Sequence, residues 1–159
     1  MLGEVARVLR PGGLFLSGEW ERGPTFASPV TGNPSTISAT YHLLNIVDNA
    51  LRAKHPGVFP IASHIPSWLA ESGRFRNITA QLHAVPIGDW HPDPEMKELG
   101  NTFRDMLVRY ANNLKPMLRD PELGLGEAQI NNLVTGYMND MYGVSGMIGV
   151  YRTVHAKKL

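Results

Sequence analysis

The sequence predicts an α/β fold, because short apolar strands alternate with amphipathic helices along the chain. The first such unit is the clearest. Apolar side chains recur at helical spacing near the start and form one face of a helix: Leu2, Val5, Ala6 and Leu9. The Pro-Gly-Gly sequence at 11–13 then ends the helix and turns the chain, and the apolar run 14–16 predicts a strand covered on both faces. A helix, a turn and a buried strand are typical of a doubly wound sheet. Because no N-cap or earlier strand precedes this unit, we expect the chain to begin in the middle of a domain.

Loops and helices follow this first strand. Residues 19–34 are rich in glycine and proline, which predicts a loop. A helix begins after a cap by Ser35 or Thr36, and the Pro-Gly pair at 56–57 ends it. A short helix around 67–71 then leads to the second strand.

The second half of the chain holds two strands separated by a pair of helices. Apolar and polar residues alternate over 75–85, which predicts a strand with Ile78, Ala80, Leu82 and Ala84 on one face. The Asp-Pro pair at 93–94 is a strong helix start. The helical segment 93–142 is far longer than a usual connection, and it suits either a lid over a substrate pocket or a structural cap on the sheet. The last strand covers about 147–155.

Composition limits the classes of function. A chain of 159 residues with 43% hydrophobic and 18% charged residues is globular and long enough for a real core. A net charge of +1 gives no basic surface for nucleic acid, and no apolar run reaches the roughly 20 residues that span a bilayer. Cysteine is absent, which excludes disulfides and thiolate chemistry. The absence of cysteine identifies no compartment. The N-terminus lacks the cleavable pattern of a secretory signal, so an intracellular protein, cytoplasmic or nuclear, is the default expectation.

Two segments carry a family resemblance. The run Arg7–Gly13, followed by an apolar strand, resembles the helix and fifth strand of class I S-adenosylmethionine-dependent methyltransferases. The run Val85–Gly100 resembles the segment after the sixth strand in methyltransferases of fungal secondary metabolism and its regulators, although His91 interrupts the usual Trp-Pro pair. Both segments stand in the order that the family has. The resemblance therefore spans nearly the whole chain but only the C-terminal half of the family.

The resemblance implies a single partial methyltransferase domain over 1–159. Its parts would be a sheet with helices (1–92), a helical insertion that serves as a possible lid (93–142) and the last strand (143–159). In this family a seventh strand is inserted antiparallel beside the sixth. The resemblance also implies a methyltransferase that uses S-adenosylmethionine. This chain would contribute the side that holds a small-molecule acceptor, and it would be inactive alone.

The donor site itself is expected upstream of this chain. The family binds S-adenosylmethionine with a glycine-rich turn after its first strand and an acidic residue at the end of its second, and neither is found here. The glycine series Gly143-x-x-Gly146-x-x-Gly149 follows a helix and leads into a strand, which is the reverse of the context that a nucleotide turn requires. No cofactor-binding residue is therefore assigned in this chain.

Four residues are candidates for the acceptor site. Glu19 follows the first strand and either orients a hydroxyl and accepts its proton or is a solvated carboxylate. Trp20 either walls an apolar pocket or packs under the following loop. Trp90 lines the site or anchors its loop, and His91 is either a base or a solvated histidine. The six histidines lack the spacing of metal ligands, so no metal is expected.

Two other functions stay open. A module that has lost its donor site could bind a partner without catalysis, and its unpaired sheet edge would favour self-association. An unrelated α/β domain with a coincidental Pro-Gly-Gly turn is the third reading.

Overall fold

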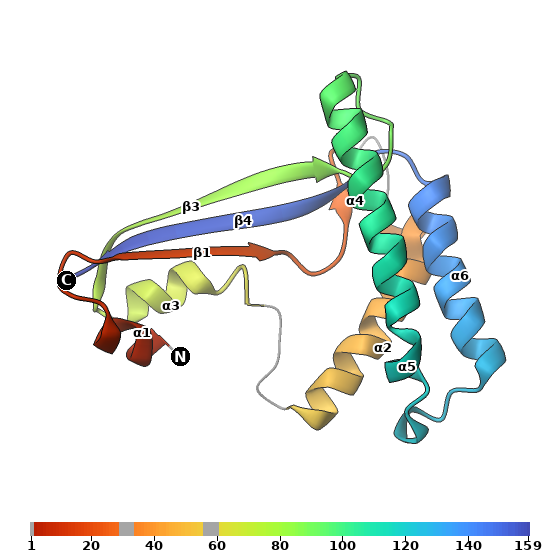
Figure 1. Ribbon diagram of the computed structural model, residues 1–159, viewed down its shortest axis with the longest axis horizontal. Helices are drawn as coiled ribbons and strands as arrows, with labels where there is room; N and C mark the ends of the chain where they lie inside the picture. The colour runs from red at the N-terminus through yellow and green to blue at the C-terminus, as the bar shows by residue number, and fades with distance from the viewer. Residues whose placement is uncertain (1, 29–33, 56–60) are drawn as a thin grey trace. The chain divides into compact units, whose positions relative to one another are not determined.

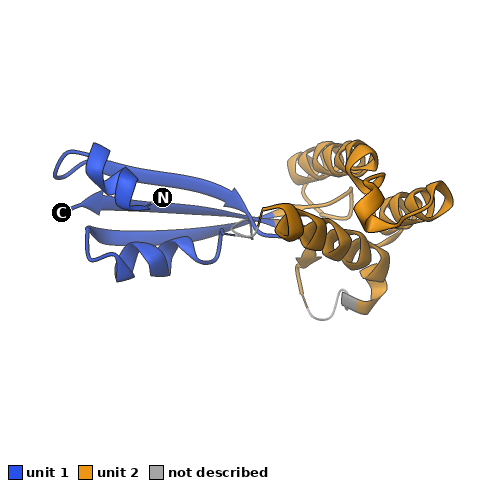
Figure 2. Cartoon of the chain, turned by 90° about the horizontal axis from the view of Figure 1, so that it is seen from below, with its two compact units in different colours: residues 1–22, 60–84, 150–159 blue, residues 23–59, 85–149 orange. Residues whose placement is uncertain are grey.

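The computed structural model describes residues 2–28, 34–55 and 61–159 (Figure 1). The predicted helix end at 56–57 and part of the predicted loop 19–34 lie outside these ranges. The chain divides into two compact units, which Figure 2 colours separately. The first unit comprises 1–22, 60–84 and 150–159, and the second comprises 23–59 and 85–149. The predicted helical segment 93–142 lies in the second unit.

The first unit contains two short helices and the greater part of three strands. Its elements are α1 (Leu2–Val8), β1 (Leu14–Trp20), α3 (Ile65–Glu71) and most of β3 (Phe75–Pro86) and β4 (Met147–Lys158). The second unit is mainly helical. Its elements are β2 (Thr25–Phe26), η1 (Pro34–Ile37), α2 (Ser38–Lys54), α4 (Pro94–Asn113), α5 (Lys115–Leu118), η2 (Pro121–Leu123) and α6 (Glu127–Gly143).

The strands form an open antiparallel sheet in which β4 is central. β1 pairs with β4 in a register that runs from Leu14 opposite Lys157 to Trp20 opposite Tyr151, and β2 pairs with Met147 and Ile148 at the start of β4. β3 also pairs with β4 and lies on the side away from β1, so β1 and β3 run in the same direction (Figure 1). The predicted mixed α/β class is confirmed. A Rossmann-like methyltransferase sheet stays a prediction.

One face of the first unit's sheet carries its core. Phe15 packs on this face, while its neighbours Leu14 and Leu16 point the other way and are 57% and 70% exposed. The prediction that 14–16 is covered on both faces is wrong, because α1 and α3 pack against one face only. The buried residues of this core are Ala6, Ile65, Leu69, Phe75, Val154 and Ala156.

A left-handed residue interrupts β3 near its start. Asn77 has a φ of 53°, which asparagine tolerates better than most residues. Phe75 and Ile78 stand three residues apart and yet pack in the same core, whereas a regular strand would place them on opposite faces. This indicates a β-bulge at Asn77. The predicted strand 75–85 is confirmed. The bulge explains how Phe75 and Ile78, three residues apart, contact the same core.

The second unit is built around α2, α4 and α6. Its largest fully buried side chains include Leu43 of α2, Tyr137 of α6, Leu118 of α5, Met147 at the start of β4 and Ile87 directly after β3. Two backbone segments approach each other closely beside this core. The Gly88 N–H donates to the Gly100 carbonyl over 2.9 Å, and a Cβ on Gly100 would stand 2.1 Å from the Gly88 oxygen. Only glycine at position 100 permits this contact.

The long helices α4 and α2 begin in different ways. α4 has the predicted N-cap, since Asp93 accepts from the Met96 N–H over 3.0 Å. The predicted cap of α2 by Ser35 or Thr36 is wrong, because the N-cap of that helix is Ile37, which makes no side-chain cap bond.

The first turn of α2 is instead bonded by α6. A carboxylate oxygen of Asp140 accepts from the Thr40 N–H and from the Thr40 hydroxyl, both over 2.8 Å. Thr40 is fully buried, so this carboxylate satisfies two groups that water cannot reach.

Charged side chains of the second unit form ion pairs at the surface. The hydrogen bond from Lys54 lowers the pKa of the Asp120 carboxyl, and the same bond raises the pKa of Lys54. Arg119 likewise lowers the pKa of Glu127, to which its Nε donates over 2.5 Å. Pairs this exposed to water add little to stability, so packing and the Asp140 bonds hold this unit together.

Candidate functional site

Glu19 and Trp20, the first two predicted site residues, lie at the end of β1. Their side chains point to opposite faces of the sheet, as successive strand residues do. The ring of Trp20 lies 5.1 Å from that of Tyr151, the residue opposite it on β4, and the two rings are tilted by 55°. Trp20 is 44% exposed. It therefore forms an aromatic pair on the open face of the sheet, and the structure does not bring it together with Glu19.

Glu19 is half-buried and lies opposite Arg152 in the register of β1 and β4, but the two side chains do not form an ion pair. The guanidinium of Arg152 instead binds Glu21, with Nε and Nη2 each 2.7 Å from the same carboxylate oxygen. Both partners are at least three-quarters buried, since they are 20% and 25% exposed. Within the described part of the chain the Glu19 carboxylate has no hydrogen-bond or ion-pair partner. It is thus free to accept a bond from a ligand.

Tyr151 owes its position to a glycine. A Cβ on Gly18 would stand 2.0 Å from the Tyr151 hydroxyl, so the tyrosine lies across the space that a side chain would fill. The sequence contains a signal for this, because glycine inside a strand often marks a close approach by another group. Tyr151, Arg152 and Glu21 were all missed as site residues, since their partners are more than a hundred positions away in the sequence.

Trp90 and His91 lie in the loop between β3 and α4. The indole N–H of Trp90 donates to the Met147 carbonyl over 2.9 Å, which fastens this loop to the start of β4. The His91 Nδ1 accepts from the Asp93 N–H over 3.2 Å. A ring whose Nδ1 accepts carries its proton on Nε2 when neutral, which leaves no free lone pair for a base. The geometry therefore favours a structural role for His91.

A small cavity of about 90 Å³ lies beside Trp90. Its lining residues come from the loop 87–90, from Arg104 of α4 and from 141–145. The guanidinium of Arg104 lies 4.8 Å from the centre of the Tyr142 ring and donates to Asn101 over 2.7 Å. Its Nε is buried without a partner in the described structure. The volume suits about three water molecules and is well below the roughly 300 Å³ of small ligand sites.

The glycine series 143–149 has the context that the sequence predicts. Gly143 ends α6, Gly146 has a φ of 82° in the link and Gly149 lies in β4. A helix thus leads into a strand, whereas nucleotide turns lead from a strand into a helix.

Neither metal ligands nor a membrane segment are found in the described ranges. No group of three or more His, Asp or Glu side chains there could hold a metal ion. None of the helices in those ranges is long and apolar enough to cross a membrane. Comparison with models of known protein families gives no match, and comparison with curated protein sequences gives none either.

Proposed function

We propose that this chain forms the acceptor-binding side of an S-adenosylmethionine-dependent methyltransferase that acts on a small molecule. The observation that carries the proposal is the position of β4. It pairs with β3 and is inserted antiparallel between β1 and β3, as the seventh strand of the resembled family is inserted beside the sixth. The Pro-Gly-Gly turn leads into β1, the strand that resembles the family's fifth.

Within this proposal Glu19 is the group that receives the acceptor's proton. Its carboxylate is half-buried and unpaired, while the adjacent cation of Arg152 is neutralised by Glu21. In methyl transfer the acceptor oxygen bonds to the methyl carbon as the carbon–sulfur bond breaks, and the hydroxyl proton passes to a base. The sulfonium is already activated, so the protein mainly aligns and desolvates the two reactants. A free carboxylate is the one further group that this chemistry needs.

Calorimetric titration of S-adenosylmethionine tests the proposal. We expect no saturable binding by this chain and micromolar binding by a form extended upstream in the same reading frame. In the extended form, Glu19→Gln is expected to lower kcat about a hundredfold and to leave the donor Kd unchanged, because a general base contributes about that factor. Glu71→Gln, an exposed carboxylate of the same unit, is the control. Tight binding by the chain alone, or full activity of the Glu19 variant, would count against the proposal.

A second candidate function is a non-catalytic interaction module. The observation that favours it is the open sheet face, where Leu14 and Leu16 are more than half exposed beside Trp20. Apolar groups in such a row mark association sites, and β1 presents an edge on the side away from β4.

Sedimentation velocity tests this second candidate. The unaltered protein is expected to show a dimer that dissociates on dilution, and Leu16→Glu is expected to be monomeric with an unchanged melting temperature. Leu99→Glu, which alters a leucine on α4 that is 45% exposed, is the matched control and should leave the dimer intact. A protein that is monomeric at every concentration contradicts the interaction module.

A further inference from the structure

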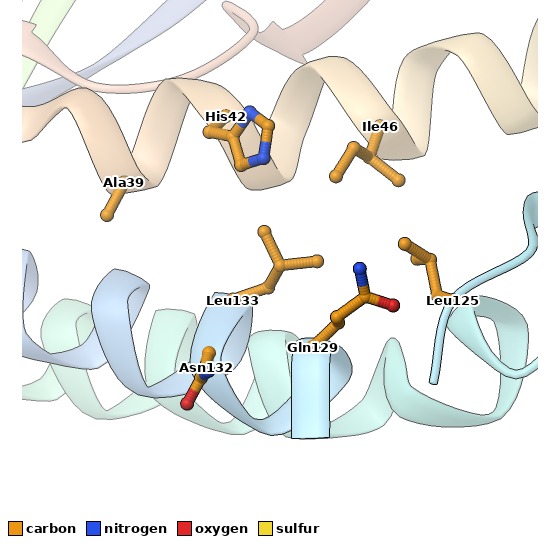
Figure 3. Close-up of a pocket in the computed structure, with 7 residues that line it drawn as sticks. All are labelled: Ala39, His42, Ile46, Leu125, Gln129, Asn132 and Leu133. Atoms are coloured by element: carbon orange, nitrogen blue, oxygen red, sulfur yellow. The ribbon is translucent and has the colours of Figure 1, made fainter. Parts of the chain in front are cut away.

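A cavity of about 370 Å³ lies between α2 and α6, away from the residues discussed so far. Figure 3 shows Ile46 of α2 and Leu133 of α6 pointing toward each other across it, with Leu125 at one end. Ala39, His42, Gln129 and Asn132 complete the lining. The volume lies within the range of about 300–1,000 Å³ that small-molecule sites occupy.

The lining separates into an apolar part and a polar rim. Its apolar side chains, Ala39, Ile46, Leu125 and Leu133, are all half-buried, whereas its polar side chains are exposed. None of the described lining residues is Asp, Glu, Lys or Arg. A charged ligand would find no counter-charge here, so the lining selects an uncharged compound with an apolar body.

Gln129 determines which polar group such a compound needs. Its amide oxygen accepts from the Gly126 N–H over 2.8 Å at the start of α6, and this bond fixes the orientation of the amide. The amide nitrogen therefore faces away from Gly126, and Figure 3 shows it directed toward α2. Its N–H groups have no acceptor in the described structure. Gln129 thus offers donors at the mouth of the cavity, and a carbonyl oxygen is their natural partner.

We propose that the cavity between α2 and α6 binds a neutral ketone with an apolar body. The apolar body lies between Ile46 and Leu133, which line the cavity from the two helices. The ketone oxygen accepts from the Gln129 amide. This inference is independent of the proposed function, since it uses no donor site and only residues of the second unit.

Prodan, a neutral naphthalene ketone whose emission moves to the blue in apolar surroundings, is the probe. We expect saturable micromolar binding with a blue shift. Gln129→Glu retains an oxygen that accepts from Gly126 but replaces the donor, so it is expected to weaken binding about tenfold, which is the effect of about 1.4 kcal/mol. Asn131→Asp adds the same charge at an exposed position of α6 that does not line the cavity, so it is expected to leave the Kd unchanged. Asn132→Trp fills the space and should abolish the blue shift.

The outcomes are distinct. The proposal is supported if Gln129→Glu weakens binding of the probe and Asn131→Asp does not. Equal Kd values for the unaltered protein, Gln129→Glu and Asn132→Trp would place the probe elsewhere and overturn it, as would the absence of any saturable blue shift. Circular dichroism of each variant is the check that α6 is retained, and Gln129→Glu is expected to pass it because a carboxylate oxygen preserves the bond from the Gly126 N–H.

Discussion

Replacing Asp140 with alanine is expected to lower the free energy of unfolding by about 3 kcal/mol. The carboxylate accepts from both the N–H and the hydroxyl of Thr40, and hydrogen bonds to a charged group contribute about 1.5–3 kcal/mol each. Alanine leaves both donors buried without a partner. The variant also removes a negative charge from the N-terminal end of α2, where the helix dipole favours one. Urea unfolding followed by circular dichroism measures the change.

Two further variants isolate the cause of this loss. Asp105→Ala removes an exposed carboxylate from α4 and is expected to change stability by less than about 0.5 kcal/mol. Thr40→Val removes the hydroxyl donor, so its combination with Asp140→Ala should cost less than the sum of the two single changes. Strict additivity would show that the two side chains do not interact, and it would refute the bond that joins α2 to α6.

Gly100→Ala is expected to destabilise the protein by about 2 kcal/mol, although alanine favours a helix by about 1 kcal/mol over glycine. The added Cβ would meet the Gly88 carbonyl oxygen at 2.1 Å, so the backbones must separate. Separation strains the packing, at a cost of about 1–3 kcal/mol, and lengthens the bond between Gly88 and Gly100. The loop that carries Trp90 should become more open to proteolysis.

Two other helical glycines provide a graded comparison. A Cβ on Gly136 would meet the Cβ of Ala39 at 2.9 Å, and one on Gly143 would meet nothing within 4 Å. We expect Gly143→Ala to be neutral or slightly stabilising and Gly136→Ala to fall between the other two. Thermal unfolding of the three variants gives the order. If Gly100→Ala is as stable as Gly143→Ala, the close approach of the two backbones is incorrect.

Local chemistry made part of this fold predictable. The Pro-Gly-Gly turn, the strand predicted at 75–85 and the start of α4 after Asp93 each depend on a few adjacent residues, and the structure has all three. Burial was less predictable. Leu14 and Leu16 have the apolar character of a core, and nothing within the strand reveals that helices cover only one of its faces.

Contacts between distant segments could not be predicted at all. Asp140 and Thr40 are 100 residues apart, and Arg152 and Glu21 are 131 apart. Each of these residues alone resembles an ordinary surface polar group, so no local pattern distinguishes it. For the same reason, the sequence could assign Glu19 and Trp20 to a strand end. It could not predict that Arg152 binds Glu21 and so leaves the Glu19 carboxylate without a partner in the described structure.

The central position of β4 has a consequence for how the chain is made. β4 follows β1, β2 and β3 in the sequence, and it is the strand with which all three pair. During synthesis those three strands therefore emerge from the ribosome without the partner that joins them. Their hydrogen-bonding edges stay open until the last strand arrives, and in this interval the nascent chain is most exposed to aggregation and most dependent on chaperones.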